Sequence, residues 1–310
     1  MQNISFFSSE NLFIRFRINY AKSAYPLNDF SVIKQIKATA LDYFLRSKQL
    51  IMAISSFGKI LTVLDLFSVS RPIINVDIIC DELNLSKPTA YRYLKELVST
   101  DILKRISGTS GDYTLGSKIA VLDYISHSTD PLVQISIPFM RDIVDRTELC
   151  CLLTYLNHDY CIDLHHETFK AAELLSYGRG CPRPVYVGAS PKIVIAHLTK
   201  QRIQSYYEQF SNELAKVGFA HDLDEFTQQM KKIKKQGFYL SQGEIDPQVC
   251  GLSVPIRFST KEAPIALTLV ASKNRFDFLN IQKLIEILQS NAAQIEHKFA
   301  TLTENQANQN

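Results

Sequence analysis

The stretch 84–98 (Asn-Leu-Ser-Lys-Pro-Thr-Ala-Tyr-Arg-Tyr-Leu-Lys-Glu-Leu-Val) constrains the fold most, because it carries both a helix start and a two-sided helix. Ser86 is a residue type that caps helices, and Pro88, with its fixed φ and missing N–H, suits a first helical turn. Apolar residues recur at helical spacing on one face: Ala90, Leu94, Leu97 and Val98. Cationic and hydrogen-bonding tips project elsewhere: Lys87, Thr89, Arg92 and Lys95. The apolar face is therefore expected to pack against the protein core, and the cationic face to contact a binding partner.

Two further helices are expected just before this one. Ser55 or Ser56 can cap a helix that Arg71-Pro72 ends. Its core-facing stripe would be Ile60, Leu61, Val63, Leu64, Leu66 and Phe67. Asn75 then caps a short helix that runs through Leu83, and three residues, 84–86, turn the chain into the next helix. This order predicts a helix-turn-helix, whose last helix enters a DNA major groove.

A β-hairpin is predicted directly after the third helix. The β-prone runs 102–106 and 113–115 are joined by the turn-rich segment 107–112. The hairpin would form the wing of a winged helix-turn-helix, with Lys104 and Arg105 near the phosphates. Residues 84–106 hold five cations and two acids, a balance of 5 − 2 = +3, which equals the formal net charge of the whole chain. The basic character is therefore local, as nucleic-acid binding requires.

Length and composition indicate two ordinary globular domains. The chain has 310 residues, about twice a typical domain, and no apolar run approaches the roughly 20 residues of a membrane helix. Its six cysteines lack C-x-x-C spacing, which favours reduced thiols and a cytoplasmic protein. Four possible metal ligands lie close in sequence (His158, Cys161, His165 and His166), but strand alternation would divide them between two faces, so neither a metal nor a cofactor is expected.

After the wing, the sequence predicts a linker helix followed by a domain that contains a sheet. Residues 116–130 read as a linker helix, and residues 131–302 as an α+β domain with an antiparallel sheet flanked by helices. Helices are expected at 131–147, from Ser190-Pro191, from Asp222 to Gly237, and at 278–302. Strands are expected at 149–156, 160–166, 171–177, 238–241, 252–258 and 265–271. The tail 303–310 is polar and expected to be frayed.

Residues 1–52 form an N-terminal extension with two open interpretations. A helix over about 28–47 would pack on the next domain or on a second subunit. Alternatively, translation begins at Met52 and the earlier residues are not part of the native protein.

Several motifs resemble the IclR family of bacterial transcriptional regulators. They are Leu-Ser-Lys-Pro-Thr-Ala-Tyr-Arg-Tyr-Leu at 85–94, Asp-Ile-Leu at 101–103 and Tyr-Thr-Leu-Gly at 113–116, with weaker likeness at 180–192 and 237–255. The resemblance runs from about Ser55 to Leu302. It implies a winged helix-turn-helix at 53–115, a linker helix and a GAF-like effector domain. It also implies dimers or dimer pairs on a palindromic DNA operator, and a small organic effector, with carboxylic acids among the expected classes.

Two sets of site residues follow from the exposed helix face and from this resemblance. The expected DNA contacts are Ser86, Lys87, Thr89, Tyr91, Arg92, Lys95, Lys104 and Arg105. The expected effector contacts are Gly180, Arg183, Val187, Gly188, Ala189, Ser241, Cys250, Gly251 and Thr268. Positions that bind a small carboxylate in some relatives correspond to Ser241, Gly251, Thr268 and Val270, where Asp, Cys and Ser are commoner.

The function expected from these features is a sequence-specific, effector-responsive transcriptional regulator. The alternative is a small-molecule hydrolase or sensor enzyme whose winged helix serves dimerisation. A nucleophile such as Cys151 would need a base and an orienting group, and the chain has no Gly-x-Ser-x-Gly, P-loop or dinucleotide motif. Catalysis is therefore not expected.

Overall fold

The computed structural model describes residues 55–108, 111–157, 159–169, 178–258 and 264–307. The chain divides into two compact units between Ile125 and Ser126. The helix expected at 28–47 and the strand expected at 171–177 lie outside the described residues.

The N-terminal unit is a winged helix-turn-helix, as the sequence predicts. Its elements are α3 (Ser56–Leu61), η2 (Leu64–Leu66), β1 (Ile74–Asn75), α4 (Val76–Leu83), α5 (Lys87–Ser99), β2 (Leu103–Arg105) and β3 (Asp112–Leu115). The strands form an antiparallel sheet in the order β1-β3-β2, in which β1 was not expected. Asn75 caps α4 by accepting a hydrogen bond from the Ile78 N–H, and Asn84 ends it in the left-handed conformation. The turn is therefore built by local backbone bonds.

Two local predictions in this unit were wrong. The helix expected up to residue 71 ends at Leu61, because the Thr62 hydroxyl donates to the Lys59 carbonyl and a 3₁₀ turn follows. Leu61 is exposed rather than in the core. Ser86 does occupy the N-cap position of α5, but its hydroxyl pairs with the Thr89 hydroxyl (3.0 Å) and caps no backbone N–H.

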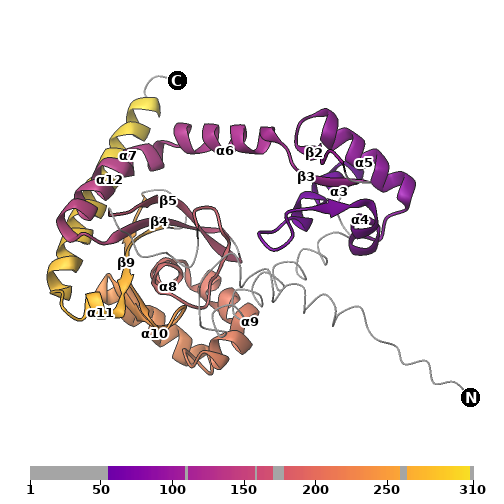
Figure 1. Ribbon diagram of the computed structural model, residues 1–310. Coiled ribbons are helices and arrows are strands. Elements are labelled where there is room, and N and C mark those ends of the chain that lie inside the picture. The colour runs from indigo at the N-terminus through magenta and orange to yellow at the C-terminus, as the bar shows by residue number, and fades with distance from the viewer. Residues whose placement is uncertain (1–54, 109–110, 158, 170–177, 259–263, 308–310) are drawn as a thin grey trace, which may run out of the picture. The chain divides into compact units, whose positions relative to one another are not determined.

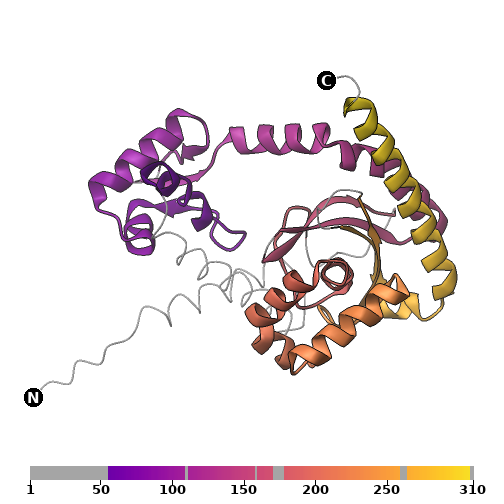
Figure 2. The ribbon, with the colours of Figure 1, turned by 180° about the vertical axis from the view of Figure 1, so that it is seen from behind.

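The C-terminal unit is a curved antiparallel sheet with helices on both faces. Its strands are β4 (Cys150–Asn157), β5 (Tyr160–Glu167), β6 (Arg183–Pro184), β7 (Tyr239–Gln242), β8 (Val249–Ile256) and β9 (Ile265–Ser272), in the order β6-β5-β4-β9-β8-β7. Its helices are α7 (Pro131–Thr147), α8 (Ala189–Ile195), α9 (Lys200–Lys216), α10 (Leu223–Gln236), α11 (Lys273–Phe276) and α12 (Ile281–Ala307). Figures 1 and 2 show the sheet curving around α8, with α7 and α12 on its outer face.

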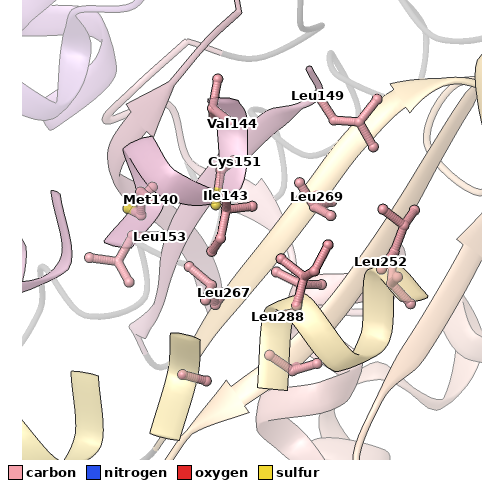
Figure 3. Close-up of a cluster of buried hydrophobic side chains, with 14 of the residues drawn as sticks. Met140, Ile143, Val144, Leu149, Cys151, Leu153, Leu252, Leu267, Leu269 and Leu288 are labelled. Atoms are coloured by element: carbon pink, nitrogen blue, oxygen red, sulfur yellow. The ribbon is translucent and has the colours of Figure 1, made fainter. Parts of the chain in front are cut away.

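Each face of the sheet packs a separate apolar core. On the outer face, Met140 and Ile143 of α7 meet Leu153 of β4, Leu267 of β9 and Leu288 of α12, all fully buried (Figure 3). On the inner face, α8 packs with α9 and α10 around Ile193, Phe226 and other buried residues. Alternate residues of a strand point to opposite faces, so the two cores share the same strands.

Four helices differ from expectation, and one of them, the short helix α11, was not predicted. α8 begins at Ala189 after Gly188, so Ser190 lies inside the helix, where its hydroxyl bonds to Thr268 instead of capping. α9 was also not predicted. α12 continues to Ala307, so residues 303–307, expected in a frayed tail, are helical, and the Thr303 hydroxyl bonds back to the carbonyls of Phe299 and Ala300.

α6 (Ser117–Thr129) follows the wing and contains the boundary between the two units. It has no buried residue. Within the described part of the chain, no helix has the length and apolar character needed to cross a membrane.

Candidate DNA-binding surface and effector cavity

Helix α5 has the two faces that the sequence predicts. Ala90, Leu94 and Leu97 are buried in the core of the N-terminal unit, together with Tyr93, which the sequence reading left out. Lys87, Tyr91, Arg92 and Lys95 are exposed on the helix, and Thr89 is half-buried. A helix held by one face and cationic on the other has the form of a recognition helix.

Lys87 already has a carboxylate partner within the unit. Its Nζ lies 2.9 Å from Oδ1 of Asp77 on α4, and both side chains are about two-thirds exposed (65% and 67%). Exposed ion pairs are weak, so a phosphate can compete with Asp77 for this ammonium group.

The wing adds two more exposed cations. Lys104 and Arg105 follow the buried Leu103 on β2 and pair in register with Thr114 and Tyr113 of β3. Gly116 connects the wing to α6, and its N–H donates to the Ile102 carbonyl (2.7 Å). The wing is therefore fixed to the body of the N-terminal unit by backbone bonds.

The C-terminal unit contains a cavity of about 60 Å³ between α8 and the inner face of the sheet. A cavity needs about 10–15 Å³ to hold one water molecule, so the space equals about four to six waters. Its lining residues are Leu152, Asp163, Arg183, Gly188, Ala189, Ser190, Ser241, Ile245, Asp246, Val249, Gly251, Thr268 and Val270. A pocket with apolar walls and a few convergent polar groups is typical of a small-molecule site.

Six of the nine predicted effector residues line this cavity: Arg183, Gly188, Ala189, Ser241, Gly251 and Thr268. The other three lie elsewhere. Gly180 is exposed and its N–H donates to the Asp163 carbonyl, Val187 is buried, and Cys250 packs in the outer core. Cys250 and Gly251 are consecutive on β8, so they point to opposite faces of the sheet.

The most polar part of the cavity wall is an ion pair that the sequence reading missed. Asp163 on β5 accepts hydrogen bonds from Arg183 on β6, from the Thr154 hydroxyl (2.7 Å) and from His166 Nε2 (2.9 Å). Burial alone would raise the pKa of Asp163, but Arg183 and these hydrogen bonds outweigh it and lower that pKa. The signal in the sequence was a single acid in the otherwise apolar run Cys-Ile-Asp-Leu at 161–164.

Glu244 holds the loop that opens α8. One of its oxygens accepts from the Gly188 N–H (2.9 Å) and from the Lys192 ammonium, and the other accepts from the Tyr239 hydroxyl (2.8 Å). Gly188 has a φ of +92°, and a Cβ there would lie 2.7 Å from Ile245 Cδ1. This position therefore requires glycine, and Glu244 fixes one wall of the cavity.

A β-bulge connects the cavity wall to the end of α6. The register between β4 and β5 shifts where Leu153 and Thr154 pair with His165 and Asp163, which leaves Leu164 as the extra residue. His166 therefore points toward Asp163, whereas His165 points the other way and bonds to His127 of α6 (2.9 Å) and to Glu167 (3.0 Å). Consecutive residues of β5 thus contact the cavity wall and the linker helix.

The thiols of Cys151 and Cys161 are poorly suited to nucleophilic catalysis. Burial raises the pKa of the Cys151 thiol far above its usual range, and the pKa of Cys161 to about 12. A nucleophilic cysteine needs the thiolate at neutral pH. Among the described residues, no group of three or more His, Cys, Asp or Glu side chains is arranged to hold a metal, and His158 lies outside that set.

Two family models match this chain. The model described as "Bacterial transcriptional regulator IclR C-terminal" matches residues 124–297, and the "IclR helix-turn-helix domain" matches residues 56–107. The Pca operon regulatory protein of Acinetobacter baylyi is 23% identical over 254 residues, covering 79% of this chain and 88% of that protein. The HTH-type transcriptional regulator KipR of Bacillus subtilis is 20% identical over 243 residues, covering 78% and 95%.

Solved structures share the fold. An IclR homologue from Microbacterium hydrocarbonoxydans, complexed with 4-hydroxybenzoate, has a TM-score of 0.66 at 24% identity and covers 80% of this chain and 100% of that chain. An IclR family regulator from Brucella abortus has a TM-score of 0.64 at 17% identity, covering 79% and 92%.

Proposed function

Because this chain belongs to the IclR family of bacterial transcriptional regulators, we propose that it binds a palindromic operator as a homodimer and responds to a small organic effector in the cavity of its C-terminal unit. It is a DNA-binding transcriptional regulator with a helix-turn-helix unit followed by an IclR-type C-terminal domain. The Acinetobacter and Bacillus relatives are both regulatory proteins. We expect the protein to act in the cytoplasm, where the DNA is.

The observation that carries the proposal is the exposed cationic face of α5 beside the wing. Arg92 is the residue on this face that we assign to a base edge or a phosphate, because an arginine can bond both O6 and N7 of guanine. Lys87 and Lys95, with Lys104 and Arg105 of the wing, would hold phosphates and so position the helix. In a dimer the two α5 helices would enter successive major grooves about 34 Å apart.

Effector binding is supported by the cavity and by one relative. The Microbacterium homologue is complexed with 4-hydroxybenzoate, a small organic molecule. For this chain we propose that the ligand contacts Ser241, Thr268 and the loop at Gly188, all of which line the cavity.

The effector acts by linkage in this proposal. A ligand that binds one arrangement of the C-terminal unit more tightly than another changes operator affinity, and a coupling of about 1.4 kcal/mol is enough for a tenfold change. The bulge in β5 supports a physical route, because Asp163 lies in the cavity wall while His165 bonds to His127 at the end of α6.

A gel-shift experiment on DNA flanking the protein's own gene tests the DNA-binding assignment. We expect salt-sensitive, sequence-preferring binding, and we expect Arg92→Ala to weaken it by about 1–3 kcal/mol if Arg92 reads a base. If Arg92 contacts a phosphate, the loss should be uniform across sequences and the salt slope should fall by about one.

Arg146→Ala is the matched control, because it removes the same charge from an exposed helix position on α7, where Arg146 pairs with Asp142 one turn away. It should leave operator binding unchanged. Binding without sequence preference, or equal affinities for both variants and wild type, would rule out the assignment of α5 as the reading helix.

A further inference from the structure

The cavity of the C-terminal unit is small for an organic ligand. Its volume of about 60 Å³ equals about four to six water molecules. A carbon or oxygen atom with its hydrogens takes about the room of one water, so a molecule of about four to six non-hydrogen atoms would fill the space. The benzene ring of 4-hydroxybenzoate, the molecule complexed with the Microbacterium homologue, would alone take up this volume.

On the sheet side, the cavity exists because Gly251 of β8 has no side chain. Gly251 pairs in register with Ser241 of β7 and with Val270 of β9, and all three residues line the cavity. A Cβ at Gly251 would lie 3.5 Å from the Cβ of Ala189 and 3.9 Å from the Cγ2 of Thr268. These are ordinary contact distances, so one methyl group fits there, whereas a longer side chain would fill the space between the sheet and α8.

Ile245, in the loop between β7 and β8, limits the cavity beside Gly188. Its Cδ1 lies 2.7 Å from the position that a Cβ on Gly188 would occupy, and its side chain is half-buried. The neighbouring Glu244 accepts a hydrogen bond from the Gly188 N–H (2.9 Å), and the Gly243 N–H donates to the Val249 carbonyl (3.0 Å). Moving this loop outward to admit a larger ligand would therefore cost hydrogen bonds.

We propose that the effector of this cavity is a small aliphatic molecule with about four to six non-hydrogen atoms, and that Gly251 and Ile245 set this size limit. The inference rests on the proposed effector function and specifies the ligand class of the same site. Leu152 and Val270 would contact the carbon chain of such a molecule, and the Ser241 hydroxyl would contact its polar group.

The test measures binding as a function of ligand size. Acetate, propionate and butyrate lie within the size class, and benzoate and 4-hydroxybenzoate exceed it. Each acid is paired with its amide, so that the result does not depend on the charge of the polar group. All compounds are titrated into the full-length protein by calorimetry and are also added to gel shifts with the operator.

We expect the wild type to bind butyrate or butyramide at least tenfold more tightly than benzoate and benzamide. Without a size limit the order would be the opposite, because a larger ligand buries more apolar surface.

Two variants should shift the size limit in opposite directions. Ile245→Ala replaces a large side chain of the wall by a methyl group, so we expect it to bind benzoate or benzamide at least tenfold more tightly than the wild type does. Gly251→Ala adds a methyl group to the wall, so we expect it to bind butyrate or butyramide at least tenfold more weakly, with a smaller loss for acetate or acetamide. Ile203→Ala and Gly178→Ala change residues that do not line the cavity, and these matched controls should keep the wild-type order.

The outcomes separate the inference from the function on which it rests. Tighter binding of the benzene compounds than of the aliphatic ones by the wild type would overturn the size class and leave effector binding standing. An unchanged size order in both Ile245→Ala and Gly251→Ala would remove the role of these two residues. Binding in the expected order without any change in operator affinity would support the ligand class and overturn the effector function. No binding of any compound, with operator binding intact, would overturn both.

Discussion

At the scale of single residues, loss of Glu244 should strongly destabilise the C-terminal unit. Its partner Lys192 has a side chain only 4% exposed; burial lowers the pKa of this lysine, and Glu244 offsets part of that effect. Replacing Glu244 by alanine leaves a buried ammonium group without its counter-charge and releases the Gly188 N–H. We expect the free energy of unfolding to fall by about 3–5 kcal/mol, measured by urea unfolding followed by circular dichroism.

Two variants show whether the loss of stability in Glu244→Ala comes from the unpaired charge of Lys192. The double variant Lys192→Met/Glu244→Leu removes both charges and should recover most of the loss. Asp142→Ala breaks an ion pair whose side chains are half-exposed and should cost less than about 1 kcal/mol. If Glu244→Ala were no more destabilising than Asp142→Ala, the buried pair would not hold the cavity loop.

At the scale of elements, the junction between the wing and α6 has no space for a side chain at Gly116. A Cβ on Gly116 would lie 2.0 Å from the Asp101 carbonyl oxygen, and that oxygen is held in place by the N–H of Lys118. We therefore expect Gly116→Ala to destabilise the N-terminal unit by about 1–3 kcal/mol. Hydrogen exchange of the amides in α5 and β3 measures this loss.

Gly178→Ala is the matched control for that prediction. A Cβ at Gly178 meets nothing within 4 Å, so the exchange of the N-terminal unit should remain as in wild type. Equal protection in both variants would show that the wing and α6 can separate without cost.

Helices that combine a capping residue with a clear apolar stripe were predictable from the sequence, whereas α9, which lacks such a stripe, was not. α4, α7 and α10 begin at Asn75, Asp130 and Asp222, whose side chains accept bonds from backbone N–H groups two or three residues on. α9 was missed because it is mostly polar: only Tyr206, Phe210 and Leu214 are buried, and its backbone departs from helical geometry at Phe210.

The cavity depends on contacts that no local pattern contains. Asp163 and Arg183 are 20 residues apart in sequence and meet because β6 pairs with β5. The bulge at Leu164 moves His166 onto the face of Asp163, against the alternation that a regular strand predicts. Six residues of the cavity wall could be anticipated from the sequence and the family resemblance, but the acid that pairs with Arg183 could not.

At the scale of the whole molecule, α6 is the surface on which the proposed homodimer depends. Val121, Leu122, Tyr124 and Ile125 are 48–71% exposed, and at about 100° per residue they fall within an arc of roughly 160°. These apolar side chains have no buried position within the described part of the chain, so they are available to a partner. A second copy fits this role, because a palindromic operator presents two half-sites to two identical units.

Charged residues in the arc formed by Val121, Leu122, Tyr124 and Ile125 should therefore dissociate the proposed homodimer. We expect Val121→Glu/Tyr124→Glu to be monomeric in analytical ultracentrifugation and to bind the operator about 10²–10⁴-fold more weakly. In a dimer, binding at one half-site raises the effective concentration of the second DNA-binding unit at the other half-site, and a monomer loses this gain. Ser126→Glu adds a charge to the same helix outside the arc and should remain dimeric with wild-type affinity. The N-terminal unit of the double variant should keep its amide protection, since none of these side chains belongs to its core. A double variant that stays dimeric would assign the subunit interface to another surface and would leave the exposed apolar arc of α6 without its proposed partner.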